Sequence, residues 1–75
     1  DIILDYGNKT YSVEVKSSET FHYDFLKGLN YYKKLSTDIN TKRFLVYAGD
    51  ISYETNNVKI ISYKDIDQLF NEINA

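Results

Sequence analysis

Tyr11-Ser12-Val13-Glu14-Val15-Lys16 is the stretch from which the fold of this chain can be worked out. Apolar and polar residues alternate along it, which is typical of a β-strand whose two faces lie in different surroundings. A second β-rich run, Asp1 to Tyr6, precedes it, and Gly7-Asn8 between the two runs is a two-residue turn signal. The sequence therefore predicts a β-hairpin at the start of the chain.

The predicted turn also fixes how the two strands pair. A two-residue loop pairs Tyr6 with Lys9, and continuing that register places Asp1 directly opposite Glu14. Residues opposite each other in an antiparallel pair have Cβ atoms about 4.5–5.5 Å apart. Lys16, two positions after Glu14, projects from the same face. Two carboxylates and a lysine are therefore expected to gather on one face of the hairpin.

The two faces of the predicted hairpin differ in polarity. Ile2 opposite Val13 and Leu4 opposite Tyr11 form an apolar face, which we expect to pack on the core. The other face is polar and is expected to be in contact with water. Its members are Asp1, Thr10, Ser12, Glu14 and Lys16.

The middle of the chain predicts a helix followed by a buried strand. From about His22 to Ser36, apolar residues recur at helical spacing. Arg43 to Ala48 is then a continuous apolar run, which is typical of an interior parallel strand covered on both faces. This β-α-β unit predicts a strand parallel to the Glu14 strand, joined to it by a right-handed crossover.

The remaining residues predict one more strand and a last helix. Ile51–Tyr53 is a short run, residues 54–57 form a loop, and Val58–Ile61 is another strand. Ser62 is placed to cap a helix of about Lys64 to Asn74. The predicted order is β-β-α-β-β-α, an α/β fold of the α+β kind in which helices pack on a mixed sheet.

Composition narrows the chemistry. Seventy-five residues with 43% apolar content make one small globular domain. Cysteine is absent and there is one histidine, so a metal site would use oxygen ligands, which favour Mg²⁺, Mn²⁺ or Ca²⁺. The net charge of −2 argues against tight nucleic-acid binding by these residues alone. No apolar run is long enough for a membrane span, so we expect a cytoplasmic protein with no membrane partner.

The ends of the sequence and its basic segment lead to two further expectations. The chain contains no methionine and begins with an aspartate inside a predicted strand, so we expect residues 1–75 to be a single domain cut from a longer protein. Lys27, Lys33 and Lys34 on the predicted helix could contact phosphates, although a solvated helix face is the commoner use of such residues.

Asp1, Glu14 and Lys16 together are the residue types of a metal-dependent hydrolase. Carboxylates that face each other on paired strands repel, and a bridging divalent cation relieves that repulsion. A neighbouring lysine can polarise the attacking water or stabilise the charge that develops on a phosphorane. The Glu-x-Lys spacing by itself is common in alternating strands. Two charges that only solvate a strand are therefore the commoner explanation of this spacing.

Several short blocks resemble a known family. They are Asp-Ile-Ile-Leu-Asp (1–5), Val-Glu-Val-Lys-Ser-Ser (13–18), Asp-Phe-Leu-Lys-Gly-Leu (24–29) and Phe-Leu-Val-Tyr-Ala-Gly-Asp (44–50). They look like the C-terminal domain, a domain of unknown function, of a widespread group of prokaryotic AAA-type P-loop ATPases. In those proteins the domain belongs to the PD-(D/E)xK nuclease-like superfamily. The resemblance extends to about Ile66.

The resemblance implies a restriction-endonuclease-like core, truncated at its N-terminus. It implies that Asp1 and Glu14 hold Mg²⁺ or Mn²⁺ together with the carbonyl oxygen of Val15, and that Lys16 is the catalytic lysine. ATP would bind only in the ATPase region, which precedes the domain in this family. The implied partners are DNA, the ATPase region itself or another protein.

Three functions remain open on the sequence. The first is a nuclease-like domain of an ATP-binding protein, which cleaves DNA phosphodiesters with Mg²⁺ in the full-length protein and is inactive as an isolated fragment. The second is a non-catalytic module that docks to a protein or to DNA and regulates the ATPase. The third is a small α/β domain in which Glu14 and Lys16 only solvate a strand.

Overall fold

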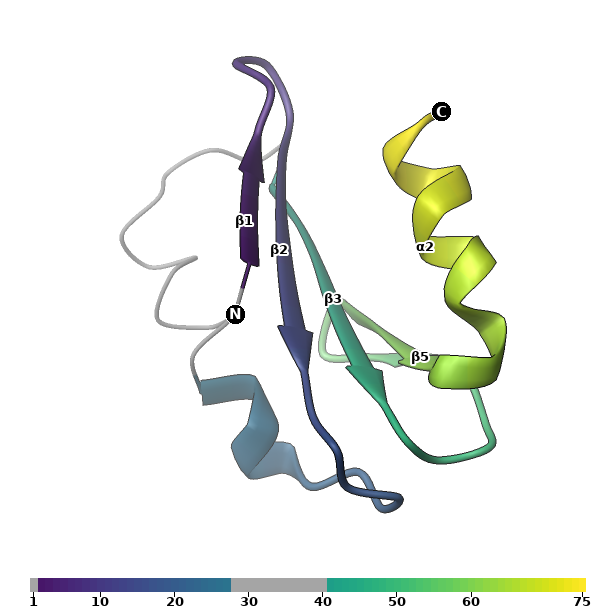
Figure 1. Cartoon of the computed structure of the whole chain (residues 1–75). Helices are drawn as coiled ribbons and strands as arrows, with labels where there is room; N and C mark the ends of the chain where they lie inside the picture. The colour runs from purple at the N-terminus through teal and green to yellow at the C-terminus, as the bar shows by residue number, and fades with distance from the viewer. Residues whose placement is uncertain (1, 28–40) are drawn as a thin grey trace.

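The structure, a computed structural model, describes residues 2–27 and 41–75 of the chain. They form a five-stranded sheet in the order β1-β2-β3-β5-β4, with helices packed against it (Figure 1). Two short 3₁₀ helices are labelled η. In chain order the elements are β1 (Ile2–Asp5), β2 (Thr10–Val15), η1 (Tyr23–Leu26), β3 (Thr41–Tyr47), β4 (Tyr53–Thr55), β5 (Val58–Ser62), η2 (Tyr63–Asp65) and α2 (Ile66–Ile73).

The hairpin of β1 and β2 has the predicted register. Ile2 pairs with Val13 and Leu4 pairs with Tyr11, in antiparallel order. The turn is closed by a 2.8 Å hydrogen bond that the Tyr6 amide donates to the Lys9 carbonyl. Gly7 lies within this turn with φ of +85°, a conformation that costs glycine little because it has no Cβ. The hairpin prediction is therefore confirmed for the residues that the structure describes.

Strands β2, β3 and β5 run parallel to one another. β2 pairs with β3 from Thr10↔Thr41 to Val15↔Val46, and β3 pairs with β5. The parallel pairing of β2 with β3 was predicted from the β-α-β pattern and is confirmed. Of the helix predicted over residues 22–36, the structure describes η1 and Lys27. The rest of that helix, and with it the crossover to β3, lies outside the described residues.

The C-terminal part differs from the prediction at one hairpin. Residues 54–57 were expected to form a loop, but Glu54 and Thr55 belong to β4, which pairs antiparallel with β5. Asn56 and Asn57 make the turn with φ of +51° and +61°. Positive φ at both loop residues is the geometry whose twist matches a tight hairpin, and asparagine tolerates it. The final helix is confirmed, with a 3₁₀ turn, η2, ahead of α2.

The buried apolar residues form one cluster on each face of the sheet. The cluster under α2 consists of Tyr11, Val13, Phe44, Val46, Ile61 and Leu69. The cluster on the η1 side consists of Leu26, Leu45, Tyr47, Val58 and Ile60. Alternate residues of β3 contribute to the two clusters, so β3 is the interior strand covered on both faces that its continuous apolar run predicted.

The polar face of β2 is more buried than its sequence predicted. Thr10 and Ser12 were expected to contact water, but they are 5% and 0% exposed. They are covered because β2 is an interior strand between β1 and β3, and both faces of the sheet are packed at this level. Exposure begins only near the end of the strand. There the side chain of Glu14 is partly exposed and that of Val15 is 58% exposed.

One part of the α2 face is left open as an apolar groove. It runs between α2 and the β1–β2 hairpin, and its lining consists of Ile2, Leu4, Val13, Val15, Val46, Ile66, Leu69, Phe70 and Ile73. Ile2 and Phe70 are 50% and 56% exposed. We refer to this feature as the apolar groove. Among the residues that the structure describes, no helix has the length and apolar character needed to cross a membrane.

Candidate functional site

Glu14 and Lys16 form an ion pair at the carboxyl end of β2. Lys16 Nζ lies 3.2 Å from Glu14 Oε1, and the two side chains are 38% and 15% exposed. The backbone beneath them is fixed, because Glu14 pairs with Leu45 and the Lys16 amide donates a 2.8 Å hydrogen bond to the Val46 carbonyl. The predicted placement of these two charges on one face is therefore confirmed, and they contact each other directly.

Aromatic rings border this ion pair. Lys16 Nζ lies 5.4 Å from the centroid of the Phe25 ring, within the range of a cation–π contact. Phe25 in turn packs edge-to-face on Phe21, whose ring also contacts Tyr53. The Lys16 ammonium is thus held between a carboxylate and an apolar ring. This arrangement limits how far its charge can swing away from Glu14.

The other two predicted metal ligands are Asp1 and the backbone of Val15. Asp1 lies outside the described residues, and the register that predicts its pairing with Glu14 is observed from Ile2 onward. The side chain of Val15 points to the opposite face, into the apolar groove, so only its backbone can serve a site on the Glu14 face. Within residues 2–27 and 41–75, no three acidic, histidine or cysteine side chains gather closely enough to hold a metal.

The oxygen atoms available at Glu14 and Val15 could supply some of the ligands of a hard divalent cation. Among the contacts that the described residues make, Lys16 reaches Oε1 of the carboxylate and none is made to Oε2. A partly buried carboxylate oxygen and a backbone carbonyl are ligands that Mg²⁺ and Mn²⁺ accept. A complete metal site requires at least one further acidic ligand. The register of the β1–β2 hairpin predicts that this ligand is Asp1.

Of the three lysines that the predicted helix carries, the structure describes Lys27. Lys27 is exposed and makes an ion pair with Asp24, 3.6 Å away. This is the solvated helix face that sequence reasoning considered the commoner use of such residues. Lys33 and Lys34 lie outside the described residues.

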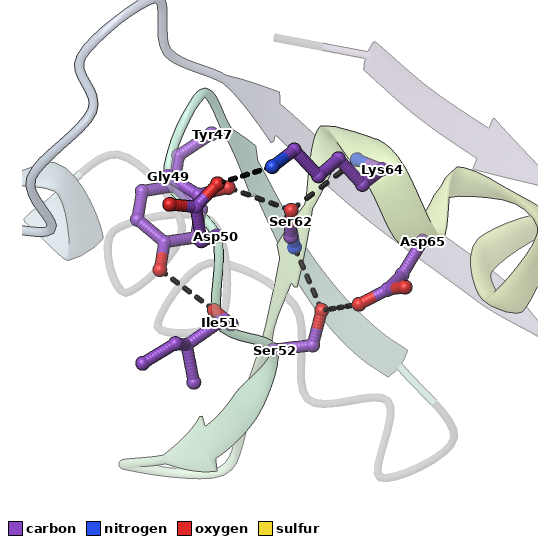
Figure 2. A network of polar contacts seen from close by, with 8 residues as sticks. All are labelled: Tyr47, Gly49, Asp50, Ile51, Ser52, Ser62, Lys64 and Asp65. Atoms are coloured by element: carbon purple, nitrogen blue, oxygen red, sulfur yellow. Dashed lines mark hydrogen bonds and ion pairs between the residues drawn. The ribbon is translucent and has the colours of Figure 1, made fainter.

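A second polar cluster lies at the carboxyl ends of β3 and β5 (Figure 2). Ser62 Oγ donates a 2.6 Å hydrogen bond to the Gly49 carbonyl and accepts one from the Lys64 amide. Ser52 Oγ accepts from the Ser62 amide at 2.8 Å and donates to Asp65 Oδ2 at 2.7 Å. These bonds tie the loop after β3 to the start of η2, so the cluster serves the fold.

Charge is also present in this cluster. Lys64 Nζ lies 2.6 Å from Asp50 Oδ1, and both side chains are exposed. The hydrogen bond to Asp50, followed by the attraction of its charge, raises the pKa of Lys64 above its ordinary value. The pair therefore favours the protonated lysine in the folded chain.

Gly49 is required where the loops after β2 and β3 meet. The Ala48 amide donates a 2.9 Å hydrogen bond to the Ser18 carbonyl, which continues the pairing of the two strands beyond their ends. A Cβ on Gly49 would lie 2.6 Å from the Glu19 carbonyl oxygen and 2.3 Å from the Tyr47 ring. Both distances are shorter than real Cβ contacts allow, so no larger residue fits here.

Two buried polar residues lie on the Glu14 face further from the strand end. The Arg43 guanidinium donates to the carbonyls of Asn56 and Asn57, and its burial lowers its pKa. These bonds fasten β3 to the β4–β5 turn. The Ser12 hydroxyl, opposite Arg43 in the register, is buried and has no hydrogen-bond partner within residues 2–27 and 41–75.

Sequence reasoning identified the Glu14–Lys16 pair but missed most of the second cluster. Ser62 was expected to act as a helix cap, and its acceptance of the Lys64 amide confirms that role. Ser52, Asp50 and Asp65 carried no comparable signal, because their contacts depend on how three loops approach one another. One available signal is that polar residues after parallel strands collect at a common edge of the sheet.

The described residues thus form a small mixed α+β domain, with a five-stranded mixed sheet and a C-terminal helix. Residues 1–66 match the family described as "Domain of unknown function (DUF4143)". The match covers most of the chain, so the chain belongs to this family. None of the curated proteins and none of the solved structures matches the chain significantly.

Proposed function

We propose that the chain is the restriction-endonuclease-like C-terminal domain of a cytoplasmic ATP-binding protein of the AAA type, truncated at its N-terminus. In the full-length protein, the domain would cleave DNA phosphodiesters with Mg²⁺ or Mn²⁺. The observation that carries the proposal is the 3.2 Å contact between Lys16 Nζ and Glu14 Oε1 at the carboxyl end of an interior parallel strand. The resemblance of the sequence blocks at residues 1–5, 13–18, 24–29 and 44–50 to a PD-(D/E)xK domain also supports it.

Each residue has a distinct role in the proposed site. The carboxylates of Glu14 and Asp1 and the carbonyl oxygen of Val15 would hold the metal ion. A bound Mg²⁺ or Mn²⁺ supplies a Lewis acid that activates water and neutralises phosphate charge. Lys16, as the cation of an ion pair, is suited to stabilise the negative charge that develops on phosphorus during attack. ATP would bind in the ATPase region and not at this site.

The surroundings of the pair suit this role. Glu14 is 15% exposed, so its carboxylate is partly desolvated and interacts more strongly with a cation than a fully hydrated one does. The site also lies at the carboxyl edge of the parallel strands, where open α/β sheets place their ligands.

Plasmid cleavage by the full-length protein tests the proposal. We expect nicking or linearisation that requires Mg²⁺ or Mn²⁺ and is lost in Glu14→Ala and Lys16→Ala. Lys64→Ala is the matched control, because it removes a lysine from the same edge of the sheet and should retain cleavage. Cleavage by Glu14→Ala equal to that of the unsubstituted protein would contradict the proposed site.

A second candidate function is that of a non-catalytic module that docks to a protein or to DNA and regulates the ATPase. The apolar groove favours it, because soluble domains rarely leave such a surface open without a use. In that case, regulation of ATP hydrolysis in the full-length protein survives Lys16→Ala unchanged.

A further inference from the structure

Lys16 is the positive charge that the fold itself brings to Glu14. Its Nζ lies 3.2 Å from Oε1, and within residues 2–27 and 41–75 no second cation contacts this carboxylate. The side chain of Glu14 is largely buried, so its charge is partly removed from water and gains from a nearby cation. The ammonium therefore already supplies at Glu14 the compensation that a divalent cation would also supply.

The lysine reaches Glu14 by turning back along the strand. Lys16 follows the last residue of β2, and residues two positions apart on a strand are separated by roughly 6.6 Å. A lysine at a strand end is free to extend into water, which hydrates an ammonium strongly. Here the side chain crosses that separation and meets the carboxylate instead. Pairing with Glu14, and not hydration alone, therefore sets its position.

The Phe25 ring gives Lys16 a second partner that does not depend on Glu14. Nζ lies 5.4 Å from the ring centroid, and the ring is itself held by edge-to-face packing on Phe21. The attraction between an ammonium and a ring face comes from the charge distribution of the ring, so it persists when a carboxylate is given up. Lys16 can thus leave Glu14 and still remain at the site.

One carboxylate cannot hold both cations at full strength. A divalent ion and the Lys16 ammonium together would bring three positive charges to the single negative charge of Glu14, and the two cations repel each other. Among the described residues, the contact of Lys16 is to Oε1 and none is made to Oε2, so the second oxygen gives a metal ion an approach to the carboxylate. Metal binding at Glu14 is then opposed by Lys16 until the lysine moves away.

We propose that Lys16 and a divalent metal ion compete for Glu14, so that Lys16 sets how tightly the site binds metal. Metal binding releases the ammonium from the carboxylate and frees it to meet a phosphate. The lysine is thus engaged by Glu14 until the metal is in place. This inference rests on the metal site of the proposed function and concerns the regulation of that site.

Manganese titration of lysine variants tests the competition. Electron paramagnetic resonance measures free Mn²⁺ in solutions of the 75-residue chain without DNA. Lys16→Met keeps the length of the side chain and removes its charge. We expect it to bind Mn²⁺ about three- to fivefold more tightly than the unsubstituted chain, because a partly exposed ion pair contributes no more than this. Lys16→Arg keeps the charge and should bind Mn²⁺ no more tightly than the unsubstituted chain.

Lys27→Met is the matched control for net charge. Lys27 is exposed and pairs with Asp24, 3.6 Å away, so its replacement removes one positive charge without touching Glu14. It should leave the affinity for Mn²⁺ unchanged. A gain in Lys27→Met equal to that in Lys16→Met would reduce the effect to net charge and would overturn the competition.

The titration separates the inference from the proposed function. If Mn²⁺ binds the unsubstituted chain at least as tightly as Lys16→Met, the metal site stands and the competition is wrong. If neither chain binds Mn²⁺, the metal site itself is wrong and the competition fails with it. Tighter binding by Lys16→Met supports the competition whether or not the full-length protein cleaves DNA.

Nuclear Overhauser contacts in the unsubstituted chain provide a second measurement that needs no substitution. Without metal, the ε-methylene protons of Lys16 should show contacts to the side-chain protons of Glu14. Saturating Mg²⁺, which is diamagnetic, should abolish these contacts, with saturation followed by the shift of the Glu14 amide signal. Contacts that persist at saturation would show that both cations share the carboxylate, and would overturn the competition.

Discussion

The two polar clusters at the carboxyl edge of the sheet differ in what their side chains contact. Around Ser62, the hydrogen bonds run largely to backbone groups, and they join the loop after β3 to η2. Glu14 and Lys16 instead contact each other, and within the described residues neither side chain forms a hydrogen bond to the backbone. The first arrangement holds the fold together, whereas the second leaves charge available at a fixed place. This contrast is the reason for assigning chemistry to Glu14 and Lys16.

Gly49→Ala should have the largest effect on stability. The added Cβ would lie 2.6 Å from the Glu19 carbonyl oxygen, and backbone cannot yield as the tip of a flexible side chain can. We expect the free energy of unfolding to fall by about 3 kcal/mol, the upper end for overpacking. Urea denaturation followed by circular dichroism measures it. A loss below about 1 kcal/mol would show that the junction of these loops is looser than the structure indicates.

Ser62→Ala should have the next largest effect. The substitution removes the hydroxyl that donates to the Gly49 carbonyl and accepts from the Lys64 amide, while the side chain is fully buried. Leaving a buried carbonyl unsatisfied costs about 1–3 kcal/mol. The same denaturation experiment measures the loss, and Ser17→Ala on an exposed loop is the control. Equal stability of the two variants would contradict a structural role for the cluster.

Lys64 should contribute a small stabilisation that depends on pH. Its pKa is raised by Asp50, so the folded chain binds this proton more tightly than the unfolded chain. The contribution is present below the ordinary lysine pKa of about 10.4 and is lost as the pH rises through the raised folded value. Thermal unfolding between about pH 9 and 11.5 should show a smaller alkaline loss in Lys64→Met than in the unsubstituted chain. Parallel curves would exclude this contribution.

Local sequence determined most of the fold. The Gly7-Asn8 turn fixed the hairpin register because a two-residue loop permits one pairing, and the structure shows that pairing from Ile2 to Asp5. The continuous apolar run of β3 predicted its burial on both faces. Glu54 and Thr55 were assigned to a loop because they are polar, although Asn56-Asn57 after them is a residue pair that tolerates the positive φ of a tight hairpin.

Features that depend on contacts between segments distant in the sequence could not be predicted from local sequence. Thr10 and Ser12 alternate with apolar residues, and alternation cannot reveal that both faces of an interior strand are covered. The hydrogen bond of Ser52 to Asp65 joins residues 13 positions apart through loops with no characteristic sequence. For the candidate site, sequence predicted that Glu14 and Lys16 share a face. It could not predict that Phe25 would lie against Lys16.

Paramagnetic broadening by Mn²⁺ tests the central claim most directly. Nuclear magnetic resonance of the 75-residue chain records which amide signals broaden at substoichiometric Mn²⁺. The account predicts broadening centred on Glu14, Val15 and Lys16, and its loss in Glu14→Gln, which stays folded because a partly exposed ion pair contributes about 1 kcal/mol or less. Broadening that centres on Asp50 or Asp65 instead, or that persists in Glu14→Gln, would contradict a metal site at the end of β2.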